Sequence, residues 1–378
     1  MAVLALWSVA LFLHGVGAPA RSIYRELPRN ATAAAANCWG RRLSAREGYV
    51  STTQSDATLA GLKILCQEGG NAADASAAVQ FALAVTQPQS TGIGGGCFIL
   101  RRDGTTGQVT ALDGREEAPK LFHPNVFCLD EDCLLNPECE CLEGPIPTSE
   151  RAIGGLAAGI PGVVAAAARL VADNGSLPLS TILGPAIALA EDGFVMYDGL
   201  HSSIQSSISK LRRFEATADL FLSPDRSAPR VAVGELFQNP DLASTLRLLA
   251  TVGAQAFYTE GPLPGEIAEA AQNAVNEVTG KFGLMAPGDI EGYKAVYREP
   301  VRSTYRGREI LGFPMPSSGG ASLAFTLNYL EAWAVAPAHE RSGMRPEHVG
   351  RFIDAQNAAF ADRNLYMADG DFVDVSTN

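Results

Sequence analysis

Histidine is scarce in this chain, and its few copies are scattered. The 378 residues include five histidines, and no two of them are three or four residues apart. Zinc ligands on a helix usually have that spacing, so the sequence predicts no metal site. We interpret the histidines as surface or capping residues, except for the first, which lies in a predicted leader: His14, His123, His201, His339 and His348.

The glycine motifs of nucleotide enzymes and of serine hydrolases are also missing. Neither a GxxxxGK[ST] phosphate loop nor a GxSxG nucleophile elbow occurs. The stretch STGIGGGCF, residues 90–98, leads into a predicted strand, whereas a dinucleotide fingerprint follows a strand and opens a helix. We therefore interpret this stretch as a tight crossing of two backbones and predict no cofactor.

Two serines in PMPSSGG, residues 314–320, stand at a predicted helix start. Ser317 or Ser318 would cap that helix through its hydroxyl, and the glycines would let the chain turn sharply. Either serine could instead act as a nucleophile, but no histidine lies nearby in the sequence to activate it. We favour the capping role.

Positive charge is in short supply. Lys and Arg number 29 against 41 Asp and Glu, which gives a formal net charge of −12. An acidic surface repels phosphate backbones, so the sequence predicts no nucleic-acid partner. Apolar residues make up 47% of the chain and charged residues 19%, a balance typical of a compact globular protein with a large buried core.

The N-terminal apolar run, residues 3–13, is too short to span a bilayer comfortably, which takes about 20 residues. Small residues follow it, which predicts a signal peptide over residues 1–20, cleaved after Ala20. Because no Lys or Arg precedes the run, a retained membrane anchor and a buried N-terminal helix are the alternatives. Secretion or display at the cell surface agrees with the glycosylation sequons at Asn30 and Asn174.

Most of the seven cysteines gather in one segment, residues 128–141, which contains Cys128, Cys133, Cys139 and Cys141. In an oxidising compartment this cluster predicts a surface loop closed by one or two disulfides. A zinc site is the alternative, but the segment has no CxxC pair. Cys66 and Cys97 lie in apolar stretches and are expected to be core thiols, and the odd total leaves at least one thiol unpaired within the chain.

Hydrophobic periodicity predicts an arm followed by one packed domain. Residues 21–48 have no clear period and are expected to form a poorly ordered arm, and the domain is expected over residues 49–378. The start signals are Ser55 or Asp56 for the first helix, Asn71 for the second and Pro161 for the third. Helices are expected at 55–70, 71–88, 159–175, 179–194, 239–253, 262–280, 318–335 and 346–370, and strand pairs at 97–113 and 298–314. This pattern predicts an α+β fold in which helices pack on a mostly antiparallel sheet.

The stretch LDGREEAP, residues 112–119, places Arg115 just after the second predicted strand. A salt bridge to Asp113, Glu116 or Glu117 is one interpretation, and the residues alone favour it. The other is a substrate site, because the planar guanidinium can grip a carboxylate with two parallel hydrogen bonds.

Several motifs, in order and spacing, resemble the γ-glutamyltransferase (glutathione hydrolase) family of N-terminal-nucleophile hydrolases. The resemblance runs almost end to end from Tyr49. The matching stretches are GGNAADASAAVQFALAVTQPQSTGIGGGCF, LDGREEAP, GGLAAGIPGV, GPAIALAEDGF, QNPDLASTL, FPMPSSGGASLAFTLNYLE and AFADRNLYMADGDFV. The resemblance implies a four-layer αββα sandwich made of a large and a small subunit, which arise by self-cleavage of one precursor. It also implies that Arg115 binds the α-carboxylate of the γ-glutamyl group of glutathione.

The chemistry implied by the resemblance needs neither metal nor cofactor. An N-terminal threonine of the small subunit attacks the γ-carbonyl, and its own amino group serves as the base. Water or an acceptor amino acid or dipeptide then releases the acyl group. The sequence given, which ends at Asn378, resembles a large subunit without its C-terminal end and stops before the threonine nucleophile, so we expect no catalytic residue in it. Alone, it is expected to be inactive and poorly soluble.

Three hypotheses about function therefore stand. The first is a secreted or cell-surface γ-glutamyl hydrolase and transferase whose partners are glutathione, other γ-glutamyl compounds and the small subunit. The second is a non-catalytic, shortened form that binds such compounds or pairs with another subunit. The third keeps the enzyme class and changes the amide that is cleaved. The cysteine-rich segment at 128–141 is an insertion beside the common family pattern.

Overall fold

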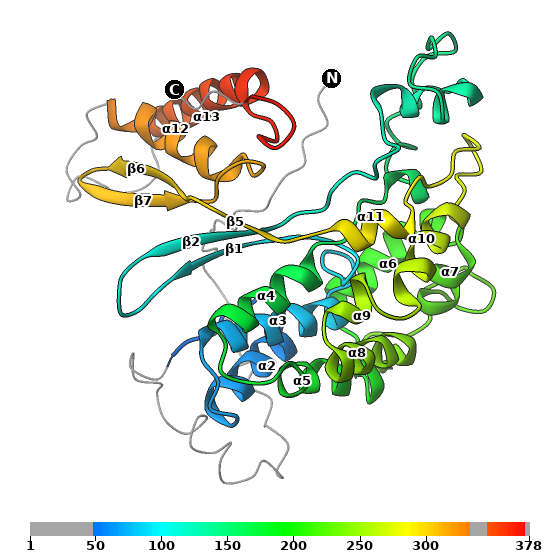
Figure 1. The fold of residues 1–378 in the computed structure, drawn as a ribbon, viewed down its shortest axis with the longest axis horizontal. Helices are drawn as coiled ribbons and strands as arrows, with labels where there is room; N and C mark the ends of the chain where they lie inside the picture. The colour runs from blue at the N-terminus through cyan, green and yellow to red at the C-terminus, as the bar shows by residue number, and fades with distance from the viewer. Residues whose placement is uncertain (1–47, 333–345, 375–378) are drawn as a thin grey trace.

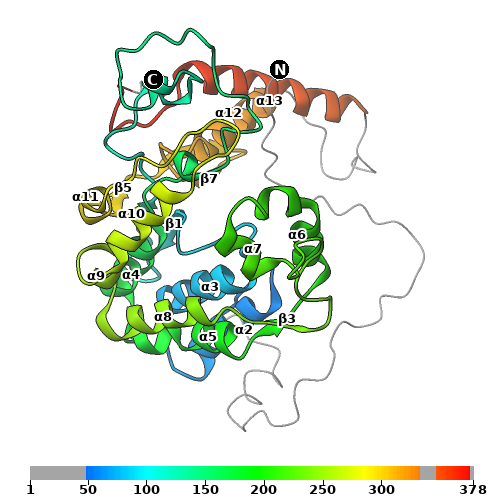
Figure 2. The ribbon, with the colours of Figure 1, turned by 90° about the vertical axis from the view of Figure 1, so that its right-hand side faces the viewer.

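The computed structural model describes residues 48–332 and 346–374. Its secondary structure is mixed, and Figure 1 shows four successive layers: helices, the sheet of β1, β2 and β5, the hairpin of β6 and β7, and finally α12 and α13. Figure 2 shows the same order from the side, with α12 and α13 at one end and α2, α5 and α8 at the other. The α+β prediction is confirmed. The leader, the arm and the sequon at Asn30 lie outside the described residues.

The first helical layer is built around α3 (Ala72–Thr86), which packs against α2 (Ser55–Cys66), α4 (Val163–Asn174) and α5 (Leu179–Glu191). Its small side chains are buried, Ala78 and Ala82 completely, so its neighbours can approach closely. Asn71 caps α3 through a capping box with Asp74, as predicted. The cap of α2 is Gln54, so the prediction of Ser55 or Asp56 is wrong.

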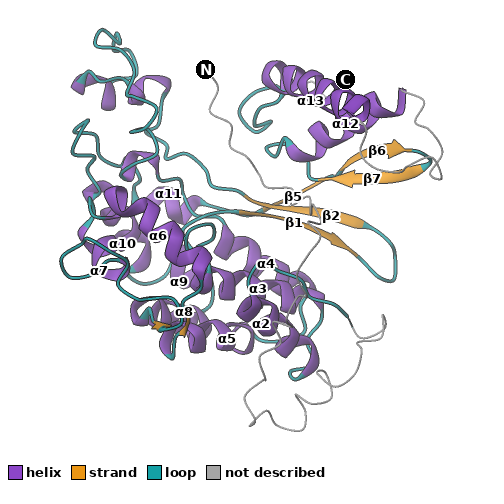
Figure 3. Ribbon diagram, turned by 180° about the vertical axis from the view of Figure 1, so that it is seen from behind, coloured by secondary structure: helices purple, strands orange, loops and turns teal. Residues whose placement is uncertain are grey.

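The predicted hairpin is present as β1 (Cys97–Arg102) and β2 (Val109–Gly114), which are antiparallel with Cys97 opposite Gly114. A third strand, β5 (Val296–Arg298), joins β2 with Ala111 opposite Arg298. Leu112 of β2 packs on Ala166 and Leu170 of α4, which fixes this sheet to the helical layer. Figure 3 shows the sheet lying between these helices and the second hairpin.

The second predicted hairpin is β6 (Val301–Tyr305) and β7 (Arg308–Gly312). Both residues of its turn have positive φ, 51° at Arg306 and 72° at Gly307, as a tight two-residue turn requires. The helices α12 (Gly319–Ala332) and α13 (Pro346–Tyr366) cover it, as Figure 1 shows.

The remaining elements connect these layers. α8 (Pro240–Val252) packs on α5. α10 (Leu263–Asn273) ends earlier than predicted, because the backbone leaves the helix at Ala274. The elements that were not predicted are short, except for the serine-rich helix α6: β3 (Phe194–Val195), α6 (Asp198–Leu211), α7 (Glu215–Phe221), β4 (Leu236–Phe237), α9 (Gln255–Tyr258) and α11 (Pro287–Gly292). Among the helices of the described ranges, none has the length and apolar character of a membrane span.

The cysteine-rich loop is closed by the disulfides Cys128–Cys141 and Cys133–Cys139, so the disulfide prediction is confirmed. Three short 3-10 helices lie in or near it, at Pro124–Phe127, Glu131–Leu134 and Gly155–Ala157. Cys97 is free, as predicted. The prediction that Cys66 is a core thiol is wrong, because Cys66 is disulfide-bonded. It lies at the half-exposed end of α2.

Candidate functional site

Arg115 follows the last residue of β2, and both of its backbone groups are held. Its N–H donates to Oδ1 of Asp113 over 2.9 Å, and its carbonyl accepts the hydroxyl of Tyr293 over 2.8 Å. Its side chain is exposed, and the guanidinium carbon lies 5.7 Å from the centre of the Phe98 ring on β1. The base of the side chain is therefore fixed, while its charged end faces outward beside an aromatic ring.

No carboxylate of residues 48–332 and 346–374 forms an ion pair with Arg115. The salt-bridge interpretation is therefore wrong for Asp113, Glu116 and Glu117. Asp113 is engaged elsewhere, because its Oδ2 accepts Nε of Arg298 over 2.7 Å. The donors of the Arg115 fork thus remain available for a carboxylate from outside.

Tyr293 is itself firmly placed. Its ring stacks on that of Tyr258 at 5.8 Å and 20°, and the Tyr258 hydroxyl donates to the carbonyl of Pro161 over 2.8 Å. Burial raises the pKa of both phenols, so both hydroxyls remain protonated donors at neutral pH. A Cβ at Gly162 would lie 2.1 Å from the Tyr293 oxygen, so only glycine fits beside this hydroxyl.

The carboxylates of Asp113 and Asp371 share one guanidinium, that of Arg298. Arg298 is the last residue of β5, and its Nη1 donates to Oδ1 of Asp371 over 3.0 Å. The hydrogen bonds to Asp371 and then to Asp113 raise the pKa of Arg298, and those from Arg298 lower the pKa of Asp371. We call the six residues that meet here the Arg115 cluster: Phe98, Asp113, Arg115, Tyr293, Arg298 and Asp371.

The glycine-rich loop lies directly beside this cluster. A Cβ at Gly96 would be 2.6 Å from the Glu116 carboxylate and 2.7 Å from the carbonyl of Gly114. The carbonyl of Gly95 accepts the N–H groups of Gly162 and Val163, each over 3.0 Å, at the start of α4. The interpretation as a tight crossing is confirmed at Gly96, where the backbone of Gly114 and Arg115 comes too close for any side chain.

The cysteine and the serines that could act as nucleophiles are not activated. Burial, followed by the charges of Glu116 and Asp113, raises the pKa of the Cys97 thiol to about 12, so little thiolate exists at neutral pH. Ser317 accepts the N–H of Gly319 at the start of α12, and Ser318 accepts Nε of Arg363. These contacts agree with the capping role for Ser317 and give Ser318 a structural role.

The described ranges contain no group of three His, Cys, Asp or Glu residues that could hold a metal ion. The sequon residue Asn174 ends α4, and its carbonyl accepts the amide of Asn71 over 2.8 Å. The hydroxyl of Ser176 in the same sequon donates to the buried Asp74 over 2.8 Å. Glycosylation at Asn174 stays a prediction.

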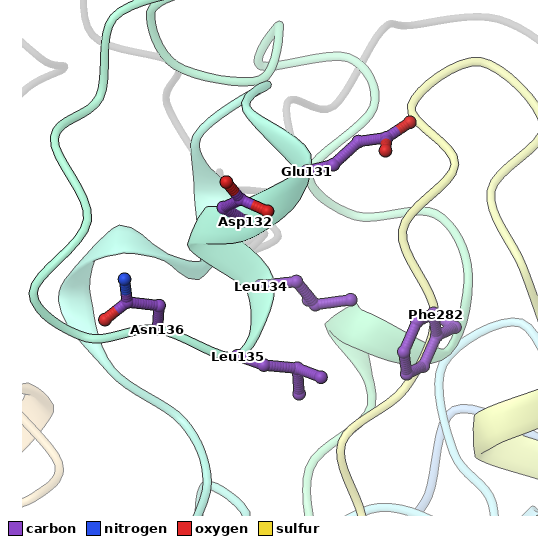
Figure 4. A pocket seen from close by; sticks show the side chains of 6 residues that line it. All are labelled: Glu131, Asp132, Leu134, Leu135, Asn136 and Phe282. Atoms are coloured by element: carbon purple, nitrogen blue, oxygen red, sulfur yellow. The ribbon is translucent and has the colours of Figure 1, made fainter.

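A separate pocket of about 410 Å³ lies on the cysteine-rich loop (Figure 4). Leu134, Leu135 and Phe282 form its apolar part. Its polar lining consists of Glu131, Asp132 and Asn136. The loop has a small core of its own, in which Leu134 packs with Val126 and Leu284. None of the residues that line this pocket belongs to the Arg115 cluster.

The sequence predicted the position of Arg115 but not the residues that hold it. Tyr293, Arg298 and Asp371 follow Arg115 in the chain by well over a hundred residues, and no local spacing links them to it. The stretches around two of them were singled out in the sequence, although no role was assigned to the residues themselves. Asp371 lies in AFADRNLYMADGDFV, and Arg298 begins REPVRSTYRGREILGFP.

A family model described as gamma-glutamyltranspeptidase matches residues 57–378. The glutathione hydrolase proenzyme of Escherichia coli K12 is 33% identical over 333 residues, which cover 88% of this chain and 52% of that protein. The acylase ACY 1 proenzyme of Pseudomonas sp. V22 is 32% identical over 340 residues, which cover 89% of this chain and 57% of that protein. The chain thus spans about half the length of the curated relatives it matches.

Solved structures agree with the sequence comparison. The crystal structure of Helicobacter pylori gamma-glutamyltranspeptidase superimposes with a TM-score of 0.77 at 31% identity, covering 88% of this chain and 87% of that one. A cephalosporin acylase from Bacillus halodurans superimposes with a TM-score of 0.69 at 28% identity, covering 86% of this chain and 56% of that one.

Proposed function

The chain belongs to the gamma-glutamyltranspeptidase family, and from that premise we propose that it holds the glutamate end of a γ-glutamyl substrate. The reaction is cleavage of the γ-glutamyl amide of glutathione and related compounds, with transfer of the acyl group to water or to an amino acid or dipeptide. The observation that carries this proposal is the Arg115 fork, which is fixed at its backbone, paired with no carboxylate of the described residues and exposed.

Arg115 would bind the α-carboxylate through two parallel hydrogen bonds, which orient the glutamyl group as well as attract it. Phe98 supports this orientation, because its ring lies beside the guanidinium. The family resemblance assigns the attack on the γ-carbonyl to an N-terminal threonine of the small subunit. Its amino group would take the proton from the hydroxyl, so the acyl-threonine intermediate forms without a histidine.

The small subunit is the partner we propose, and the surface of α12 and α13 supports it. Large apolar side chains lie exposed along these helices and the segment that follows: Leu323, Phe325, Tyr329, Val349, Phe352, Ile353, Phe360, Leu365, Tyr366, Phe372 and Val373. Such a surface on a globular protein usually marks an interface.

We propose that the protein is secreted or displayed at the outer cell surface. The disulfides in the cysteine-rich loop support this proposal, because they persist in oxidising compartments. The predicted leader at residues 1–20 and the sequons at Asn30 and Asn174 agree with it. A leader that stays uncleaved would anchor the protein in the membrane instead.

The decisive experiment is hydrolysis of glutathione by the full-length protein, meaning this chain produced together with the small subunit, and by its Arg115→Ala variant. Loss of a bidentate charged pair should raise KM about 100-fold, since each charge-assisted hydrogen bond contributes about 1.5–3 kcal/mol. The control is Arg102→Ala, which removes the same charge from the exposed end of β1. An unchanged KM would reject glutamate binding by Arg115.

A second candidate is the hydrolysis of another amide, and the acylase relatives favour it. An acylase substrate need not carry an α-carboxylate. Activity toward a simple acyl anilide that survives Arg115→Ala, together with none toward glutathione, would favour this candidate. A protein that binds glutathione and cleaves no amide would instead be the non-catalytic binding form.

A further inference from the structure

The two oxygens of Asp113 have different partners. Oδ1 accepts the N–H of Arg115 over 2.9 Å, and Oδ2 accepts Nε of Arg298 over 2.7 Å. The outer nitrogens of Arg298 donate to both oxygens of Asp371. A continuous chain of hydrogen bonds therefore runs from the segment after α13, through β5, to the backbone of Arg115.

Burial explains why Asp113 depends on this chain. The side chain of Asp113 is only 7% exposed, that of Arg298 is 20% exposed and that of Asp371 is 54% exposed. A buried carboxylate without a counter-ion is strongly destabilising, and Arg298 supplies the counter-ion of Asp113. Asp371 occupies the other side of the guanidinium, and this second contact limits the ways in which Arg298 can turn.

The chain of hydrogen bonds also changes the charge around Arg115. Glu116 and Glu117 follow Arg115 directly, and burial, Asp369, Asp371 and Asp113 together raise the pKa of Glu117. An arriving carboxylate would meet these acidic groups as well as Arg115. Because Arg298 neutralises Asp113, it removes one negative charge from the approach to Arg115.

We propose that Arg298 and Asp371 are positioning residues, which fix Arg115 through Asp113 and thereby couple the segment after α13 to the affinity for the substrate carboxylate. The affinity part of this proposal rests on the proposed function of Arg115. The positional part does not, because it concerns only where the Arg115 backbone lies. The two parts can therefore be tested separately.

The positional test is hydrogen exchange of the Arg115 amide in the full-length protein without ligand, read with residue resolution. Asp371→Asn should speed exchange at this amide about tenfold. Loss of the charge on Asp371 weakens its hydrogen bonds to Arg298, and a tenfold change in exchange rate corresponds to about 1.4 kcal/mol. Asp371→Glu should restore slow exchange. The control is Glu309→Gln, which breaks a similar surface pair with Arg302 on the second hairpin. Unchanged exchange in Asp371→Asn overturns the proposal.

The affinity test is steady-state hydrolysis of glutathione by Asp371→Asn and by a further variant, Arg298→Lys. Asp371→Asn and Arg298→Lys should raise KM about tenfold and leave kcat within about twofold, since positioning affects binding rather than chemistry. A loss confined to kcat, or an unchanged KM beside faster amide exchange, overturns the coupling to affinity. If the wild-type protein exchanges slowly at Arg115 but does not hydrolyse glutathione, the proposed function is overturned. The positional part is then decided by the hydrogen-exchange result alone.

Discussion

At the scale of single residues, the site depends on the difference between the backbone and the side chain of Arg115. Its backbone is held by Asp113 and Tyr293, while its guanidinium is free of carboxylates of the described chain. Because the backbone is already fixed, only the side chain of Arg115 has to become ordered when a ligand binds, which favours affinity. Its exposed end also explains why a carboxylate, rather than an apolar group, is the ligand we expect.

Removing the Tyr293 hydroxyl tests its hydrogen bond to the carbonyl of Arg115. We expect Tyr293→Phe to lower the free energy of unfolding by about 1 kcal/mol, because the carbonyl of Arg115 loses its donor while the stacking on Tyr258 remains. Urea denaturation measures this. Tyr297→Phe removes a hydroxyl that donates to Asp173 at a more exposed place, and a loss as large there would mean that the Tyr293 contact has no special role.

Asp74 tests the pH dependence of the fold. Burial raises the pKa of this carboxyl, but hydrogen bonds from Asn71, Ser176 and Leu177 outweigh it and lower the pKa below its ordinary value of 3.8. The stabilisation is therefore present above pH 3.8 and is lost as the pH falls through the lower, folded-state value.

We expect Asp74→Asn to destabilise the protein at pH 7 by about 2 kcal/mol and to flatten the loss of stability below pH 4. Thermal unfolding between pH 3 and pH 7 measures both effects. Asp192→Asn is the control, because Asp192 is exposed at the end of α5. A variant at Asp74 that follows the wild-type pH curve would contradict this account.

The residue scale also marks what the sequence could predict. Arg115 stood out because a motif surrounded it, and Cys128 to Cys141 stood out because spacing and compartment imply disulfides. The contacts of Tyr293, Arg298 and Asp371 depend on β5 and the segment after α13 folding back onto β2. No periodicity within one stretch encodes such a contact, so only the folded chain reveals it.

At the scale of elements, close backbone approach fixes how β2, α4 and α11 meet. Gly162 lies between the carbonyl of Gly114 and the hydroxyl of Tyr293. Tyr293 closes the end of α11 and carries the contact to Arg115. A side chain at Gly162 would therefore displace the strand end that positions the site.

We expect Gly162→Ala to cost about 3 kcal/mol of stability, because its Cβ would lie 2.1 Å from Tyr293 Oη and 2.3 Å from the Gly114 carbonyl. Gly265→Ala within α10 is the matched control, since no atom apart from its chain neighbours lies within 4 Å of the added Cβ. That control should stabilise the protein by about 0.5–1 kcal/mol. Equal effects of the two changes in chemical denaturation would contradict the packing described.

Elements with strong local signals were predicted well, and weak ones were not. Both hairpins and most of the long helices, though not α6, followed from periodicity and turn residues, as for Asn71 before α3 and Arg306-Gly307 between β6 and β7. β5 has three residues and α9 has four, too few to show a period. Gln54 was missed as a cap because glutamine is uncommon there, and only the folded geometry brings its side chain to the N–H of Ala57.

At the scale of the whole molecule, the layers place the site on the inner sheet and leave α12 and α13 with apolar side chains exposed. The sequence alone predicted helices packed on a sheet, and the family resemblance supplied the order of layers. Periodicity could not predict whether the outer faces of α12 and α13 are buried, because that depends on whether another chain packs on them.

The exposed apolar side chains of α12 and α13 predict that the small subunit covers this surface. A cysteine placed by Phe352→Cys on α13 should react with a maleimide at least tenfold more slowly when the chain is produced with the small subunit than when it is produced alone. Gln205→Cys on α6, an exposed site away from this face, should react equally in both. Equal reactivity at position 352 would contradict the proposed interface.

The central claim is that the Arg115 guanidinium recognises the α-carboxylate, and a double-mutant cycle tests it most directly. The full-length protein and its Arg115→Ala variant would hydrolyse γ-glutamyl-p-nitroanilide and the 4-aminobutyryl analogue, which lacks that carboxylate. We predict that the wild type prefers the carboxylate substrate about 100-fold in kcat/KM and that Arg115→Ala loses nearly all of this preference. A variant that keeps the preference, while losing activity equally toward both substrates, would contradict the claim.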